Sequence, residues 1–155
     1  PQPYLPFAIV DTDVSTLTGT PAASVRVPWK SGGTYTMGYD YDPATGTYLR
    51  SMPWGPHVLA DGQRVSTDNV LVIRAGQRTA KLAPGSGAPD PIHDIIDATG
   101  TFVYAHGGRS VQGTWSKGAV ADPFAFTLTD GTPLAMAAGR TFVELPAADA
   151  DVQLA

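Results

Sequence analysis

Apolar and polar residues alternate along several short stretches of the chain, which is the two-residue period of a half-buried β-strand. The alternation is clear in Ser24–Trp29 and is repeated with aromatic residues in Thr34–Tyr41. Thr47–Met52 has the length and composition of a return strand. Asn69–Arg74 is instead a nearly continuous apolar run, which indicates a strand that is covered on both faces. The pattern therefore predicts short strands rather than long helices.

Turn-forming residues separate these stretches at regular intervals. Asp, Pro and Gly in succession favour a tight turn, because Asp accepts backbone hydrogen bonds, Pro fixes φ and Gly tolerates positive φ. A tight turn is predicted at Ala60–Gln63. Three hairpins are predicted, at Pro43–Gly46, at Gly107–Gly108 and at Asp130–Gly131, the last between Phe124–Leu128 and Leu134–Met136.

The remaining segments are assigned by weaker signals. Phe7–Val10 is predicted to be a short buried strand, and Arg140–Leu145 is predicted to be the last strand of the domain. Loops are expected at Asp11–Ala23 and at Ala83–Pro91, where Thr, Ser, Gly and Pro are common. If there is any helix, it is expected to be a short one near His93–Asp97.

The composition supports an all-β fold in a single domain. The chain has 155 residues, of which 17 are Gly and 14 are Pro, and these would interrupt long helices almost everywhere. We predict mostly antiparallel sheets of short hairpin-connected strands, arranged as a sandwich or a partly open barrel. Residues 1–22 are expected to form an extended N-terminal segment or linker, residues 23–146 the β domain, and residues 147–155 a frayed tail.

Charge and motifs exclude several classes of function. The net charge is −4 and the Lys and Arg residues are scattered, so we expect no nucleic-acid partner and no polybasic membrane patch. The absence of Cys excludes disulfides and thiol chemistry. No phosphate loop, dinucleotide fingerprint or nucleophile elbow is present, and the histidines lack the spacing of metal ligands, so we predict no cofactor and no metal.

One group of residues has the chemistry of a binding or catalytic site. Tyr48 and Arg50 are two apart on one strand and therefore share a face, while Trp54 and His57 follow closely and Asn69 opens the next long strand. Arg offers a fixed fork for a carboxylate or phosphate, and His can exchange a proton near neutral pH. The structural alternative is that Arg50 pairs with an Asp across the hairpin and Tyr48 belongs to the core.

A second group consists of Trp115 and Lys117, which also share one face of a strand. An exposed Trp beside a Lys suits a sugar or peptide ligand. A Trp at the end of a strand more often fills a core, and this alternative is the more common one.

Several short motifs follow one another in a definite order: Tyr39–Arg50, Pro56–His57, Asp68–Val72, Gly113–Lys117, Thr129–Gly131 and Gly139–Leu145. Their order and spacing resemble the C-terminal domain of the YerB-like bacterial lipoproteins, a family of unknown function. Phe142 stands where that family usually has Trp, and Val58–Leu59 replace an Asp that often follows Pro-His. The resemblance covers about Val25 to Pro146.

The resemblance implies an extracytoplasmic domain of a membrane-tethered parent protein that has an additional N-terminal domain. It implies no catalytic residues. Membrane association is expected only through an anchor outside this chain. We expect a non-catalytic envelope module that binds a protein or a cell-wall glycan. The alternative is a wall-modifying hydrolase that uses Arg50, His57 and Asn69.

Overall fold

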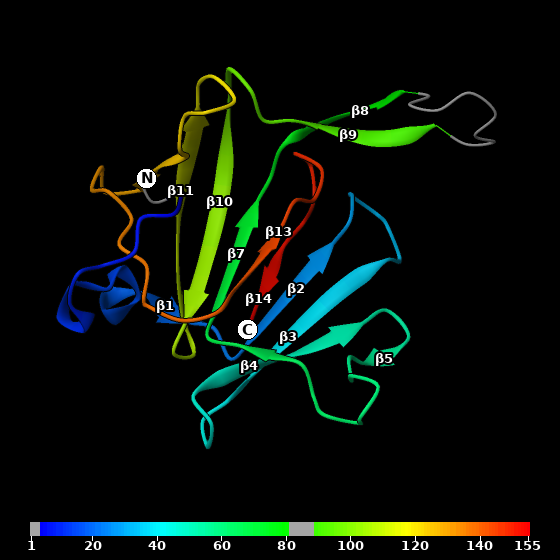
Figure 1. The fold of residues 1–155 in the computed structure, drawn as a ribbon, viewed down its shortest axis with the longest axis vertical. Coiled ribbons are helices and arrows are strands. Elements are labelled where there is room, and N and C mark those ends of the chain that lie inside the picture. The colour runs from blue at the N-terminus through cyan, green and yellow to red at the C-terminus, as the bar shows by residue number, and fades with distance from the viewer. Residues whose placement is uncertain (1–3, 81–88) are drawn as a thin grey trace.

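The computed structural model describes residues 4–80 and 89–155, and it consists almost entirely of strands. Two large sheets and a two-stranded ribbon account for the strands of this part of the chain (Figure 1). In the first sheet the order is β1-β11-β10-β7-β13, and β12 pairs with the second half of β11, from Gly113 to Ser116. Its strands are β1 (Thr20–Pro21), β7 (Asn69–Ile73), β10 (Ala98–His106), β11 (Arg109–Lys117), β12 (Ala125–Leu128) and β13 (Thr141–Glu144).

The second sheet has the order β14-β2-β3-β4-β5, with β6 also paired to β4. The ribbon of β8 and β9 projects from one end of the molecule (Figure 1). The strands of the second sheet are β2 (Ser24–Pro28), β3 (Thr36–Asp42), β4 (Thr47–Met52), β5 (Gly55–Pro56), β6 (Ser66–Thr67) and β14 (Gln153–Leu154). Those of the ribbon are β8 (Gly76–Ala80) and β9 (Asp90–Asp94).

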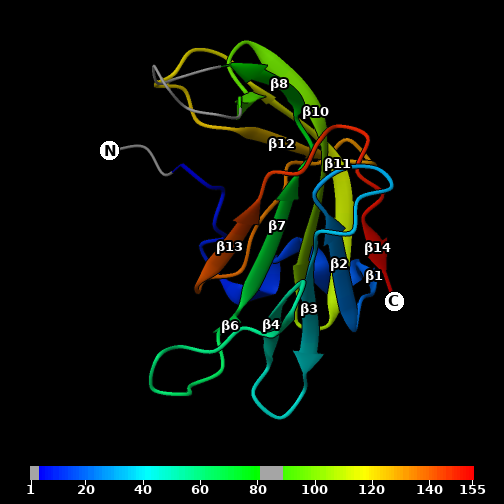
Figure 2. The same cartoon turned by 90° about the vertical axis from the view of Figure 1, so that its right-hand side faces the viewer.

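The first sheet carries a hydrophobic core on each face. Its inner face packs against β2, β3 and β4 of the second sheet (Figure 2). This inner core contains Val25, Val27, Met37, Tyr39, Tyr48, Val70, Val72, Val103 and Ala105. The outer core contains Leu71, Ile73, Ala75, Phe102, Tyr104, Trp115, Phe126, Leu134 and Met136. The all-β class predicted from the sequence is confirmed, and no helix in the described residues is long and apolar enough to cross a membrane.

Strand β7 lies in the middle of this arrangement. It pairs antiparallel with β10 on one side and parallel with β13 on the other, and all five of its residues are buried. This confirms the prediction of a strand covered on both faces. The parallel register places Phe142 beside Val70 and Glu144 beside Val72, so both β13 side chains point toward the inner core. That placement brings an acidic residue to the junction of the two sheets.

Two of the three predicted hairpins are confirmed in full. The turn at Pro43–Gly46 joins β3 to β4, and Gly107–Gly108 joins β10 to β11. At Asp130–Gly131 the chain does turn back, with a single bridge between Thr127 and Pro133, but no return strand follows. Beyond this bridge the Leu134 amide still donates to the Phe126 carbonyl at 3.1 Å, and the side chains of Leu134 and Met136 then pack into the outer core.

The N-terminal segment also differs from the expectation. Phe7–Val10 makes only one bridge, from Phe7 to Met136, and Ile9 is almost fully exposed, so the predicted buried strand is wrong. The predicted loop that follows contains two 3-10 turns, Asp11–Asp13 and Ser15–Thr18, before β1. Residues 1–3 of the expected linker lie outside the described part of the chain.

Three further segments differ from what the sequence predicts. His93 and Asp94 belong to strand β9, and Asp97 has a φ of 48°, so no helix forms there. In the tail that was expected to fray, residues Gln153 and Leu154 pair with β2. Of the predicted loop at 83–91, residues 83–88 lie outside the described part of the chain, and Asp90 begins β9.

The close pairing of β11 and β12 can be tested by mutation. A Cβ added to Gly113 would collide with the carbonyl oxygen of Thr127 and lie 2.8 Å from the Cα of Leu128, both of which are backbone. We expect Gly113→Ala to lower the free energy of unfolding by about 1–3 kcal/mol, because overpacking against backbone cannot be relieved by a side-chain rotation. Urea denaturation measures this change.

Gly76→Ala is the matched control, since its added Cβ would meet Asp94 only at an ordinary 3.8 Å. We expect its unfolding midpoint to match that of the wild type. Equal midpoints for the two variants would contradict the β11–β12 register.

Candidate functional site

Arg50 lies at the junction of the two sheets. It faces Tyr39 across the β3–β4 pair, and both side chains point toward the inner core. The Arg50 Nε donates to the Tyr39 hydroxyl at 3.0 Å, and Nη2 donates to Glu144 Oε1 of β13 at 3.3 Å. The Tyr39 hydroxyl in turn donates to the same carboxylate oxygen. These three residues therefore link the second sheet to the edge of the first.

The charges of this cluster are buried and balanced. Arg50 and Glu144 are 8% and 7% exposed. Burial alone would lower the pKa of Arg50, but its hydrogen bonds and electrostatic interactions with Tyr39 and Glu144 raise it above its ordinary value. Burial, together with the neighbouring Glu144, raises the pKa of Tyr39. Tyr39 therefore remains a neutral donor, and Arg50 and Glu144 form a buried ion pair.

His57 lies on the other side of the same guanidinium. Its Nδ1 is 2.8 Å from Arg50 Nη1, which also contacts Met52 Sδ at 2.8 Å. Because a guanidinium can only donate, Nδ1 accepts this hydrogen bond and the neutral ring carries its proton on Nε2. The Phe142 ring covers the guanidinium, with its centroid 4.8 Å from Arg50 Cζ. Every side-chain nitrogen of Arg50 thus has a partner within the chain.

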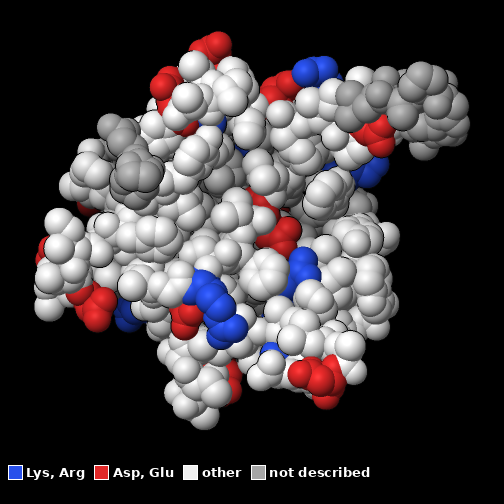
Figure 3. Space-filling view, in the orientation of Figure 1, with Lys and Arg blue, Asp and Glu red and all other residues white. Residues whose placement is uncertain are grey.

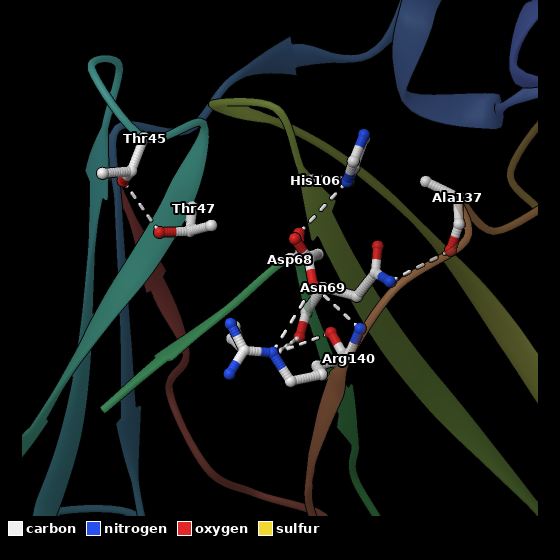
Figure 4. A network of polar contacts seen from close by, with 8 residues as sticks. Thr45, Thr47, Asp68, Asn69, His106, Ala137 and Arg140 are labelled. Atoms are coloured by element: carbon white, nitrogen blue, oxygen red, sulfur yellow. Dashed lines mark hydrogen bonds and ion pairs between the residues drawn. The ribbon is translucent and has the colours of Figure 1, made fainter. Parts of the chain in front are cut away.

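Tyr48 and Asn69 do not join this pair. Tyr48 is fully buried, and its hydroxyl donates to the Ala22 carbonyl at 2.8 Å. The Asn69 side-chain amide donates to the Ala137 carbonyl at 3.0 Å (Figure 4). Its oxygen accepts from the Tyr104 hydroxyl at 2.6 Å. Asn69 therefore faces the outer core, on the opposite side of the first sheet from Arg50.

The second predicted group is also internal. Trp115 is 1% exposed, and its Nε1 donates to the Arg74 carbonyl at 2.9 Å. The Lys117 Nζ is buried and donates to three carbonyl oxygens of the following loop, those of Ala119, Val120 and Asp122. Both side chains therefore serve the packing of the outer core and its loop, which is the structural alternative that the sequence left open.

Trp54 has a different environment from the other predicted site residues. It lies in the turn between β4 and β5 and is 73% exposed. Its ring contacts Tyr35 edge to face, with the centroids 6.1 Å apart, and Tyr35 contacts Trp29 at 6.3 Å. Trp29 in turn contacts His93 of the ribbon at 5.9 Å. We call these four residues the aromatic face.

Local structure explains how the aromatic face is assembled. A turn at Ser31–Gly33 reverses the chain, and the Trp29 amide donates to the Tyr35 carbonyl at 2.9 Å. Trp29 and Tyr35, with Met37, line a concavity of about 350 Å³. Figure 3 shows an uncharged stretch along this edge of the molecule, below the ribbon. The aromatic face is therefore a shallow, largely uncharged surface, with the exposed Lys30 in its turn, on which an apolar or sugar ring could stack.

The sequence pointed to only one member of the aromatic face. Trp29 and Tyr35 were assigned to strand patterns, and His93 to a short helix. One sequence signal for their contact is that Trp29 and Tyr35 flank a Gly-containing turn, which places them side by side at a strand end. His93 had no such signal, because the ribbon reaches Trp29 only through the tertiary fold. Within residues 4–80 and 89–155, no group of three His, Asp or Glu side chains could hold a metal ion.

The contribution of the buried Arg50–Glu144 ion pair to stability can be tested by mutation. Arg50→Met would leave the Glu144 carboxylate buried without its cation, so we expect a loss of about 3–5 kcal/mol in the free energy of unfolding. Adding Glu144→Gln should restore part of that loss, because the uncompensated charge is removed. Equilibrium urea denaturation of the two variants measures both changes.

The pair of Arg26 and Asp40 is the matched control. Its side chains are 38% and 50% exposed, so Arg26→Met should cost about 1 kcal/mol or less. Equal losses for Arg50→Met and Arg26→Met would show that the buried pair does not hold the sheets together.

Comparisons with known proteins agree with this fold. No curated protein matches the chain. Among solved structures, the crystal structure of the YerB protein from Bacillus subtilis is similar, with a TM-score of 0.67 and 20% sequence identity. The match covers 96% of this chain and 46% of that protein, so the chain spans about half of its length. A family model described as the C-terminal domain of a protein of unknown function (DUF3048) matches residues 25–143. The chain therefore belongs to the DUF3048 C-terminal domain family, which includes YerB-like domains of unknown function.

Proposed function

We propose that this chain is a non-catalytic binding domain of the cell envelope, and that its aromatic face binds a cell-wall glycan. The observation that carries the proposal is the exposure of Trp54 and Tyr35 beside Trp29. Large exposed rings are costly to leave in water and suit a ligand that offers flat apolar faces. A sugar ring has such faces, and it carries hydroxyl groups that His93 and Gln77 on the adjoining ribbon could bond.

The extracytoplasmic location is part of the proposal. It rests on the resemblance of the sequence motifs to YerB-like lipoproteins. The similar YerB protein is about twice as long as this chain. We propose that the domain works beside an N-terminal domain of its parent protein. Any contact with the membrane would then come from an anchor in that protein.

The competing proposal is a wall-modifying hydrolase. The 2.8 Å contact between Arg50 and His57 favours it, because an arginine could hold an anion next to a proton-transferring histidine. The binding proposal is better supported, since the side-chain nitrogens of Arg50 are already engaged and Asn69 faces the outer core. Release of soluble fragments from peptidoglycan by the purified domain would favour the hydrolase instead.

Co-sedimentation with insoluble peptidoglycan tests the binding proposal. We expect the wild type to sediment with it and Trp54→Ala to lose most of this binding, because truncation of a stacking aromatic typically costs more than 1 kcal/mol. Trp54 is 73% exposed, so the thermal midpoint of the variant should stay near that of the wild type.

Leu17→Ala is the control, since Leu17 is 59% exposed on a 3-10 turn and lies outside the aromatic face. Its binding should equal that of the wild type. Retention by envelope proteins after the glycan has been digested would identify a protein partner and contradict the glycan assignment. Retention by neither material would contradict a binding role in the envelope.

A further inference from the structure

We propose that a second site, separate from the aromatic face, binds a small organic acid through its carboxylate. The site is a pocket of about 320 Å³ between the loop that leads into β6 and the start of β13. Arg64 lines one side, and Arg140 and Thr141 line the other. Leu59, Val65 and Phe142 supply an apolar wall. We call this the arginine pocket. Its lining shares no residue with the aromatic face, so the inference stands apart from the function proposed above.

Arg64 brings a positive charge that no nearby carboxylate balances. Its Nη1 donates to the carbonyl oxygens of Arg50 and His57, and its Nη2 donates to Ser51 Oγ at 3.3 Å. All three partners are neutral. In the described part of the chain no Asp or Glu oxygen lies within 4.0 Å of the Arg64 guanidinium. These contacts fix the guanidinium in place and leave its charge without a partner carboxylate.

Arg140 is only loosely paired. Its Nε is 3.9 Å from Asp68 Oδ2, and its side chain is 73% exposed. The same Asp68 oxygen already accepts a hydrogen bond from the Arg140 backbone amide at 2.8 Å. Figure 4 shows the Arg140 guanidinium pointing away from Asn69 and Ala137. Its terminal nitrogens have no partner among the described residues, so they can donate to an anion.

Thr141 contributes an unpartnered hydroxyl group beside the pocket. Its Oγ1 is buried, lies in a residue that lines the pocket, and has no hydrogen-bond partner in the described structure. Buried hydroxyl groups nearly always have a partner, so each exception requires an explanation. Because this oxygen has no accessible surface in the free protein, a ligand oxygen would accept its hydrogen bond only after the Thr141 side chain turned toward the pocket, where the two arginines favour negative charge.

These features select a class of ligand. A planar guanidinium matches the two oxygens of a carboxylate, and a charge-assisted hydrogen bond is stronger than a neutral one. The apolar wall of Leu59, Val65 and Phe142 suits a ligand with a small apolar body attached to that group, which inorganic phosphate lacks. The volume of about 320 Å³ fits a molecule of the size of an acylated amino acid. We therefore assign the site to small carboxylic acids with an apolar portion.

A titration followed by ¹H–¹⁵N NMR tests this assignment on the whole chain. The probes are N-acetylalanine, its uncharged amide and inorganic phosphate. We expect N-acetylalanine to cause saturable shifts in the backbone amides of residues 63–67 and 140–142. The uncharged amide should bind at least about tenfold more weakly, because it lacks the charge that the arginines recognise.

Two variants separate binding from folding. Thr141→Val keeps the shape of the side chain but removes the unpartnered hydroxyl, so the thermal midpoint should be unchanged or higher while the affinity for N-acetylalanine falls several-fold. Arg140→Gln should lower that affinity about tenfold, and Arg78→Gln, on the exposed ribbon, should leave it unchanged.

Four outcomes would overturn the proposal. They are the absence of saturable shifts in these segments with N-acetylalanine, equal binding of the acid and its amide, tighter binding of phosphate than of the acid, and an unchanged affinity in both Thr141→Val and Arg140→Gln. None of these results depends on whether the aromatic face binds a glycan, so the two proposals can fail independently.

Discussion

The buried contact between Arg50 and Glu144 is the interaction on which the rest of the structure depends. Burying two charges is costly unless they are paired and their remaining hydrogen-bonding groups are satisfied, and here Tyr39, His57 and Met52 supply those partners. The pair joins β4 of one sheet to β13 of the other. Arg50 also holds the loop that follows β5, because its backbone bonds to Val65 and its carbonyl accepts from Arg64. One residue thereby positions both the turn that carries Trp54 and one wall of the arginine pocket.

Local patterns predicted much of the fold. The apolar run of β7 and the turns at Pro43–Gly46 and Gly107–Gly108 could be identified, because their signals lie within a few residues of each other. The parallel pairing of β13 with β7 could not, because a strand pattern does not identify its neighbour. For the same reason the tail was expected to fray, although Gln153 and Leu154 find an open edge at β2.

The candidate site was predictable only in part, and for the same physical reason. Arg50 and His57 were grouped correctly because seven residues separate them, but the acid expected across the hairpin is replaced by Glu144, which is 94 residues away in sequence. Trp54 could be identified because it follows Arg50 closely in sequence, whereas Trp29 and His93 meet only through the tertiary fold. In the sequence, Trp115 beside Lys117 looks like a ligand-binding Trp, and only its burial in the structure shows that it belongs to the core.

We assign a structural role to Arg50 and ligand binding to Trp54, and NMR can test this assignment directly. The chain has three Trp residues, and the buried Trp115 serves as an internal reference. Soluble glycan fragments of peptidoglycan would be titrated into ¹⁵N-labelled protein while the three indole N–H signals and the Arg50 Nε–H signal are followed. We expect the Trp54 signal to shift and saturate, while the signals of Trp115 and Arg50 stay in place. A shift at Arg50 with an unmoved Trp54 signal would contradict this assignment and place the function at the junction of the sheets.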